Sequence, residues 1–131
     1  MKFTPKLVNE VAESVAYFTG DRFKMHPAAP SIGEGTRYVD YTRPQGWLGG
    51  QGAREACAYY IGGALGWAHA TGKEIPEDIT RQLMAVHGQI DIRTRAKWET
   101  EGRHRAQDLA KGEGLLRPGY TPATVEGAQH L

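Results

Sequence analysis

Apolar residues near the start of the chain recur mostly every three or four positions, the spacing of a helix that buries one face. The stripe consists of Leu7, Val8, Val11, Ala12, Val15 and Phe18. Thr4 suits the N-cap of such a helix and Pro5 suits its first position, while Gly20 suits its C-terminal end. The pattern therefore predicts a helix at about residues 5–19.

A second apolar stretch, at about residues 52–71, covers most of a helix's circumference, as expected of a central and buried helix. Its interior contains three glycines, each of which costs ~0.8–1 kcal/mol relative to alanine in a helix interior. Ala58, Gly62 and Gly66 lie four residues apart and predict a smooth strip that another backbone or an aromatic ring can approach closely. We expect this helix-packing strip to be used either within one chain or between two copies related by a two-fold axis.

Two more helical segments follow the central one. An apolar stripe predicts a third helix at about residues 76–90. Its members are Ile79, Leu83, Val86 and Ile90. Over residues 91–111 the stripe thins to Trp98 and Leu109 and charged residues dominate, which favours a solvated helix. This fourth helix is expected to be continuous with the third or joined to it by a turn.

Residues 20–51 hold three prolines and no helical period, and their length far exceeds the usual ~4–6 residues of a connection. Residues 36–42 have the composition of one short strand or extended segment. Exposed rings are unfavourable, so the aromatic residues of this irregular loop argue for order. Since Tyr, Trp and Arg are enriched at binding hot spots, five residues of the loop are predicted to bind a partner or else to cover the central helix as a lid. They are Arg37, Tyr38, Tyr41, Arg43 and Trp47.

A glycine-rich turn enters the central helix. Free backbone N–H groups at a helix start can bind an anion, so Gly49, Gly50, Gly52 and Arg54 are a candidate site for a phosphate or nucleotide. The turn lacks the Gly-Lys-Ser/Thr ending of a Walker loop, and no clear buried strand precedes it as in a dinucleotide fold. A tight turn that packs Trp47 against the helix start is the alternative interpretation.

Composition fits one globular domain. The chain has 131 residues, 40% of them hydrophobic, which suffices for a core and argues against wholesale disorder. The predicted fold is mainly α, a small bundle of three to four helices around the central helix with at most a minor strand. We expect a helical domain over residues 1–111 and a C-terminal tail over residues 112–131, frayed or laid across the surface.

The cysteine content and the length of the longest apolar run indicate the cellular compartment. A single cysteine, Cys57, excludes an intramolecular disulfide and a cysteine-built zinc site, and its apolar surroundings predict an inert buried thiol. The longest apolar run, residues 56–68, is shorter than the ~20 residues that a bilayer span needs. We therefore expect a cytoplasmic protein with no membrane partner.

The sequence offers few candidate residues for a metal, cofactor or nucleic-acid site. His87 and Asp91 share a helix face, but no third ligand is suggested by spacing, so no metal site and no cofactor are predicted. The formal net charge of +1 argues against a generic basic nucleic-acid arm. The basic residues cluster in the fourth helical segment, where a salt-bridged exposed helix is favoured over nucleic-acid contact. They are Arg93, Arg95, Lys97, Arg103 and Arg105.

The sequence thus favours a non-enzymatic interaction protein whose partner is another macromolecule, most directly a protein. A small inhibitor or adaptor, such as a phage or mobile-element accessory protein, is one setting that fits its size. The alternative is a small-ligand binder that uses the glycine-rich turn for a phosphate or nucleotide. Self-association into a homo-oligomer is compatible with the helix-packing strip.

Overall fold

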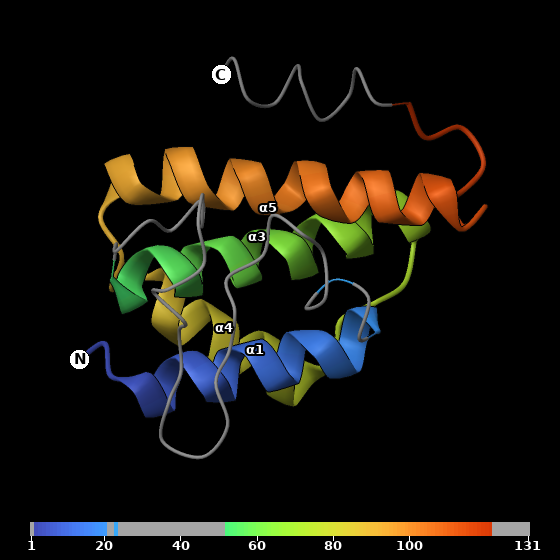
Figure 1. The fold of residues 1–131 in the computed structure, drawn as a ribbon. Helices are drawn as coiled ribbons and strands as arrows, with labels where there is room; N and C mark the ends of the chain where they lie inside the picture. The colour runs from blue at the N-terminus through green and yellow to red at the C-terminus, as the bar shows by residue number, and fades with distance from the viewer. Residues whose placement is uncertain (1, 21–22, 24–51, 122–131) are drawn as a thin grey trace.

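The structure is a computed structural model that describes residues 2–20, 23 and 52–121. Four helices lie in these residues: α1 (Pro5–Thr19), α3 (Ala53–Thr71), α4 (Glu77–His87) and α5 (Ile92–Gly112). The described residues contain no strand, so the predicted mainly α fold is confirmed. Figure 1 shows α3 in the middle of the bundle, with α5 on one side and α1 and α4 on the other. The segment 36–42, predicted as a strand or extended, lies outside the described residues.

Helix α1 begins and ends as its sequence indicates. The Thr4 hydroxyl accepts a hydrogen bond from the Leu7 backbone N–H at 3.1 Å, which satisfies one of the free donors of the first turn. At the other end Gly20 adopts a φ of +89°, a conformation that favours glycine, and its N–H donates to the Ala16 carbonyl. Four members of the apolar stripe of α1 are fully buried and the other two, Leu7 and Phe18, are partly buried against the core.

Helix α3 is the central element of the core. Most of its residues are buried around the full circumference, because α5 covers one side and α1 and α4 cover the other. The left-handed Gly72 ends the helix, and its N–H donates to the Ala68 carbonyl. None of the described helices is long and apolar enough to cross a bilayer.

Helices α4 and α5 are separate helices joined by a turn, which decides between the two predicted arrangements. Gly88 and Gln89 form this turn after His87, and Ile90 is buried against the core. Asp91 then starts α5, because its carboxylate accepts hydrogen bonds from the Thr94 backbone N–H at 3.0 Å and from the Thr94 hydroxyl at 2.8 Å.

The prediction that residues 91–111 form a solvated helix is wrong for one face of α5. That face is buried against α3 over most of its length, and half of its residues are glycine or alanine. Its members are Trp98, Glu99, Gly102, Ala106, Gln107 and Ala110. Glycine and alanine add little to an apolar pattern, so the charged outer face dominated the sequence signal.

The backbones of α3 and α5 approach each other closely along paired positions. A Cβ atom placed on Gly62 would lie 2.6 Å from the Glu99 Cα, and one on Gly66 would lie 2.7 Å from the Arg103 Cα. Real side chains essentially never approach so closely, so both positions require glycine in this packing. The residue numbers of the paired positions increase in the same sense along both helices. Helices α3 and α5 therefore run in the same direction, as Figure 1 shows.

Phe23, which follows α1 in the sequence, lies in the core. Its ring is fully buried and stacks on Tyr59, with 5.1 Å between ring centroids, and it meets Tyr60 edge-on at 5.9 Å. A Cβ atom on Gly63 would collide with the same ring. The ring therefore fills the space that Gly63 leaves on α3.

Residues 113–121 cross the far end of the bundle. The Arg117 side chain donates to the His69 carbonyl at 2.7 Å, and its backbone N–H donates to the Ala70 carbonyl at 2.7 Å. Tyr120 is buried, and its hydroxyl donates to Gln107 Oε1 at 2.9 Å. This part of the tail lies across the surface, which is one of the two predicted arrangements.

Candidate functional site

Three helices begin at one end of the bundle, and Arg54 joins them. Its guanidinium nitrogen lies 3.8 Å from a carboxylate oxygen of Asp91, the N-cap of α5. Its Cζ lies 5.2 Å from the centroid of the Phe3 ring, which precedes α1. Because Arg54 belongs to the first turn of α3, the two contacts bring the starts of α1, α3 and α5 together.

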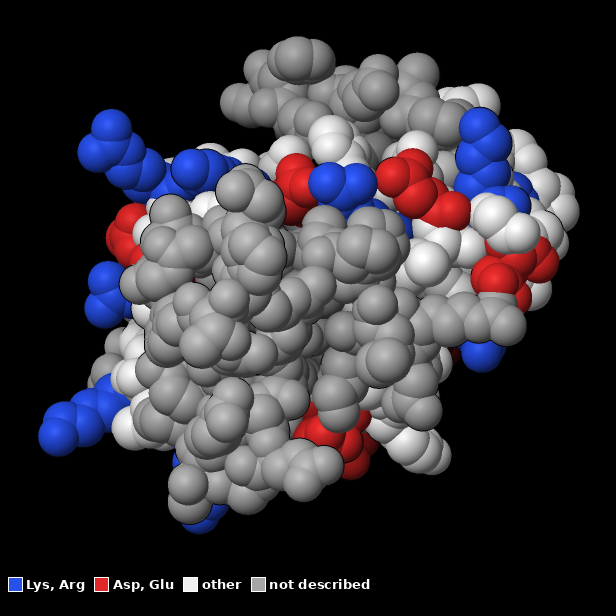
Figure 2. All heavy atoms as spheres, viewed as in Figure 1, with Lys and Arg blue, Asp and Glu red and all other residues white. Residues whose placement is uncertain are grey.

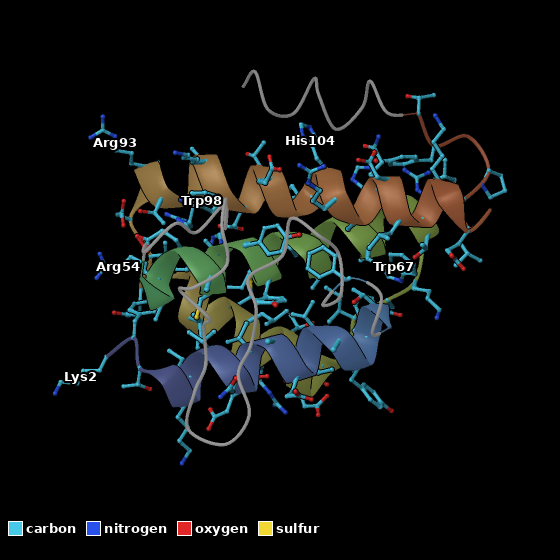
Figure 3. The ribbon with its side chains drawn as sticks, viewed as in Figure 1. Lys2, Arg54, Trp67, Arg93, Trp98 and His104 are labelled. Carbon is cyan, nitrogen blue, oxygen red and sulfur yellow. The ribbon has the colours of Figure 1, made fainter. Side chains whose placement is uncertain are left out.

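Exposed basic and apolar side chains gather at this end. Ile92, the first residue of α5, is 76% exposed and lies next to the exposed Arg93. We call the region the end surface and define it as Lys2, Phe3, Arg54, Ile92 and Arg93. Figure 3 shows Lys2, Arg54 and Arg93 projecting from the same edge of the molecule, and Figure 2 shows basic side chains standing out along that edge.

The Asp91 carboxylate, beside the end surface, is engaged in hydrogen bonds. Hydrogen bonds from the Thr94 backbone N–H, and then from its hydroxyl, hold the pKa of Asp91 below its usual value. The Asp91 carboxylate is therefore ionised at neutral pH and serves to cap α5. The first turns of α1 and α5 contain no acidic residue, whereas that of α3 contains Glu55.

A polar network joins α4 and α5 near this end of the bundle. The Arg95 guanidinium contacts His87 Nε2 at 2.6 Å, and His87 Nδ1 lies 3.0 Å from a carboxylate oxygen of the buried Glu99. A guanidinium only donates hydrogen bonds, so Nε2 accepts and Nδ1 carries the proton that is donated to Glu99. The network ties the C-terminal turn of α4 to the first turns of α5. Burial raises the pKa of Glu99, while His87, Arg103 and Arg95 partly offset this effect.

Replacement of Glu99 by glutamine is expected to remove a pH-dependent component of stability. The raised pKa means that the folded state holds the Glu99 proton to higher pH than the unfolded state, whose value is near 4.5. Its contribution is therefore greatest below that pH and is lost as the pH rises through the folded pKa. Glutamine can accept the His87 proton without ionising, so Glu99→Gln should flatten this part of the profile.

The measurement is urea unfolding of the wild type and Glu99→Gln across the acidic to neutral range. We expect the free energy of unfolding of the wild type, relative to the variant, to fall as the pH rises. A difference between the two proteins that does not change with pH would contradict the burial effect. Asp108→Asn, on the exposed face of the same helix, is the matched control for loss of one carboxylate.

Most of the predicted loop residues lie outside the described part of the chain. Neither the partner-binding set nor Gly49 and Gly50 of the glycine-rich turn is described. The partner-binding set comprises Arg37, Tyr38, Tyr41, Arg43 and Trp47. Of the candidate anion site, Gly52 is the N-cap of α3 and makes no side-chain cap, and Arg54 contacts Phe3 and Asp91.

The other predicted residues have defined places. Gly62 and Gly66 of the helix-packing strip face the α5 backbone of the same chain, and Ala58 is fully buried. Cys57 is fully buried, and burial raises the pKa of its thiol to about 12. His87 and Asp91 make the separate contacts given above, and no group of three or more metal-ligand side chains occurs among the described residues.

The predicted basic cluster is dispersed along α5. Arg95 contacts His87, Lys97 lies 4.9 Å from the centroid of the Trp98 indole, and Arg105 pairs with Glu101 at 2.8 Å. Trp98 itself is buried, so its indole is not available to stack on a base. Within the described part of the chain, Arg93 forms no ion pair, and it belongs to the end surface.

Sequence reasoning missed the end surface as a unit and the buried role of Glu99. Lys2, Arg54 and Ile92 lie far apart in the sequence. Lys2 and Ile92 resemble ordinary surface residues, and Arg54 is predicted only as part of an anion site. The one available signal was Ile92, an apolar residue off the stripe that continues to Trp98. No protein-family model, curated protein or solved structure matches the chain.

Proposed function

We propose that the protein is a non-enzymatic interaction protein, an inhibitor or adaptor, that binds another protein through its end surface. The observation that carries the proposal is the 76% exposed Ile92 beside two exposed arginines, Arg54 and Arg93. Protein interfaces combine an apolar centre with a polar rim and are enriched in arginine, so this arrangement fits a contact with a protein.

The packing of the helices supports the same proposal. The apolar stripes of α1, α3 and α4 pack against one another, and the helix-packing strip of α3 is occupied by α5. Gly62 and Gly66 therefore contact α5 of the same chain. A partner protein would bind side chains on the outside of the bundle. Ile92 and Arg54 are such side chains.

The alternative function, binding of a phosphate or nucleotide at the start of α3, stays a prediction. Gly52 begins this helix without a side-chain cap, which leaves N–H groups of the first turn without a side-chain acceptor from that residue. Arg54, however, is already placed against Phe3 and Asp91. The end surface includes the exposed Ile92, which an anion site would leave unused.

Ile92→Asp is expected to weaken partner binding about tenfold without lowering stability, since desolvated apolar anchors contribute ~1–2 kcal/mol or more to an interface. An acidic residue at the first position of α5 also complements the helix dipole. The measurement is affinity purification from native lysate, with quantitative mass spectrometry and with thermal unfolding of each variant.

Leu115→Asp is the matched control, because Leu115 is 49% exposed but lies beyond the opposite end of α5. The proposal predicts a protein that is recovered with the wild type and with Leu115→Asp but is depleted with Ile92→Asp. Equal recovery with both variants, or recovery of nucleic acid alone, would overturn it.

A further inference from the structure

We infer that the end surface binds an acidic segment of its partner protein, in which carboxylates flank an apolar side chain. The inference rests on the proposed function and adds to it the chemistry of the partner. It follows from three features of the end surface: its excess of positive charge, the placement of Arg54 and the exposed apolar area of Ile92.

The charge around the end surface is unbalanced. Lys2, Arg54 and Arg93 are exposed, and so is Lys6 in the first turn of α1. The carboxylates nearby along the chain are Asp91, which caps α5, and the half-buried Glu55. Among the described residues in and just before the first turns of α1, α3 and α5, these four exposed cations and two carboxylates leave an excess of two positive charges. Of the described helices, α1, α3 and α5 direct the positive ends of their dipoles here and α4 directs its negative end here. A partner with negative charge is therefore favoured.

Arg54 is placed to receive a carboxylate. The Phe3 ring supports one face of its guanidinium, and Asp91 lies 3.8 Å away, which is a long contact for an ion pair. About half of the side chain remains exposed, at 52%. A planar guanidinium that is already oriented loses little freedom when it forms two parallel hydrogen bonds with a carboxylate.

The neighbouring surface favours an acidic protein segment over a nucleic acid. A phosphate backbone requires several unpaired cations along its path. Along α5, however, Arg95, Lys97 and Arg105 are engaged with His87, Trp98 and Glu101. Ile92 also gives the surface an apolar element, which a phosphate backbone would leave uncovered. An acidic segment with an apolar residue would match both the positive charge of the end surface and the exposed side chain of Ile92.

The test is a fluorescence anisotropy titration of the full chain with three labelled probes. The first is a peptide rich in Glu and Leu, the second is the same peptide with every Glu replaced by Gln, and the third is a single-stranded oligonucleotide. We expect binding of the Glu peptide alone. Binding should weaken as salt is raised above ~0.1 M, where charges more than ~10 Å apart are screened.

The variant Arg54→Glu/Arg93→Glu should weaken binding of the Glu peptide about a hundredfold, roughly tenfold for each reversed charge. Its matched control is Lys73→Glu/Arg81→Glu, which makes the same change in net charge at exposed residues away from the end surface and should bind as the wild type does. Thermal unfolding establishes that both double variants are folded.

Three results would overturn the inference: equal binding of the Glu and Gln peptides, tighter binding of the oligonucleotide, or equal weakening by both double variants. Failure to bind the Glu peptide at all would overturn it as well. The proposed function is tested separately, by the effect of Ile92→Asp on binding of the natural partner. A partner that is lost with Ile92→Asp but retained with Arg54→Glu/Arg93→Glu would leave the function intact and remove the acidic segment.

Discussion

Replacement of Gly62 by alanine is expected to lower the free energy of unfolding by ~3 kcal/mol, although alanine is the better helix former by ~1 kcal/mol. The new methyl group would meet the backbone of α5 at Glu99, with its Cα at 2.6 Å. A helix backbone cannot move aside as the end of a flexible side chain can. The two helices must therefore separate and lose contacts along their whole interface.

The measurement is chemical and thermal unfolding of Gly62→Ala, with a decrease in melting temperature of roughly 10 °C. Gly112→Ala is the matched control, because Gly112 is the last residue of α5 and a Cβ there would meet nothing within 4 Å. That variant should be unchanged or slightly more stable. A Gly62→Ala protein as stable as Gly112→Ala would contradict the close approach of α3 and α5.

The same close approach creates the end surface. Because Gly62 lies against Glu99 and Gly66 against Arg103, α3 and α5 lie side by side in the same direction. Their first turns consequently meet, which places Arg54 of α3 beside Asp91 of α5. A sequence with bulkier residues at the two glycines would move these first turns apart. The glycines therefore serve the proposed binding site indirectly, through the position of α5.

The helices themselves were predictable because their signals are local. Thr4 and Gly20 mark the ends of α1, and apolar spacing identifies the buried faces of α1 and α4. The burial of α5 was not predictable in the same way, since its inner face depends on glycine and alanine fitting against glycines of α3. The helix-packing strip was visible as a pattern, but its partner within the chain was not.

The end surface could not be predicted because it depends on tertiary structure. Its residues come from three separate segments, which only the packing of α1, α3 and α5 brings together. The sequence predicts an anion site at Arg54, yet nothing in it places Phe3 and Asp91 beside this residue. The role of Glu99 was hidden for a similar reason, since His87 reaches it from a different helix.

Replacement of Phe23 by alanine is expected to lower the free energy of unfolding by ~3–5 kcal/mol. The ring is fully buried, stacks on Tyr59 and meets Tyr60 edge-on, so its removal leaves a cavity bounded by two rings and the α3 backbone. The measurement is urea unfolding. Tyr17→Ala is the matched control, because Tyr17 is an aromatic residue nearby in the sequence that is 83% exposed, and its loss should change stability by less than ~0.5 kcal/mol.

Gly63 provides a sharper test of the same contact through a double-mutant cycle. In the wild type Gly63→Ala should be destabilising, because the new Cβ would collide with the Phe23 ring. In a Phe23→Ala background the ring is gone, so alanine at residue 63 gains its helix propensity of ~1 kcal/mol and fills part of the cavity. The sign of the Gly63→Ala effect should therefore reverse between the two backgrounds, since residues in direct contact are not additive. Additive effects would mean that Phe23 does not occupy the space above Gly63.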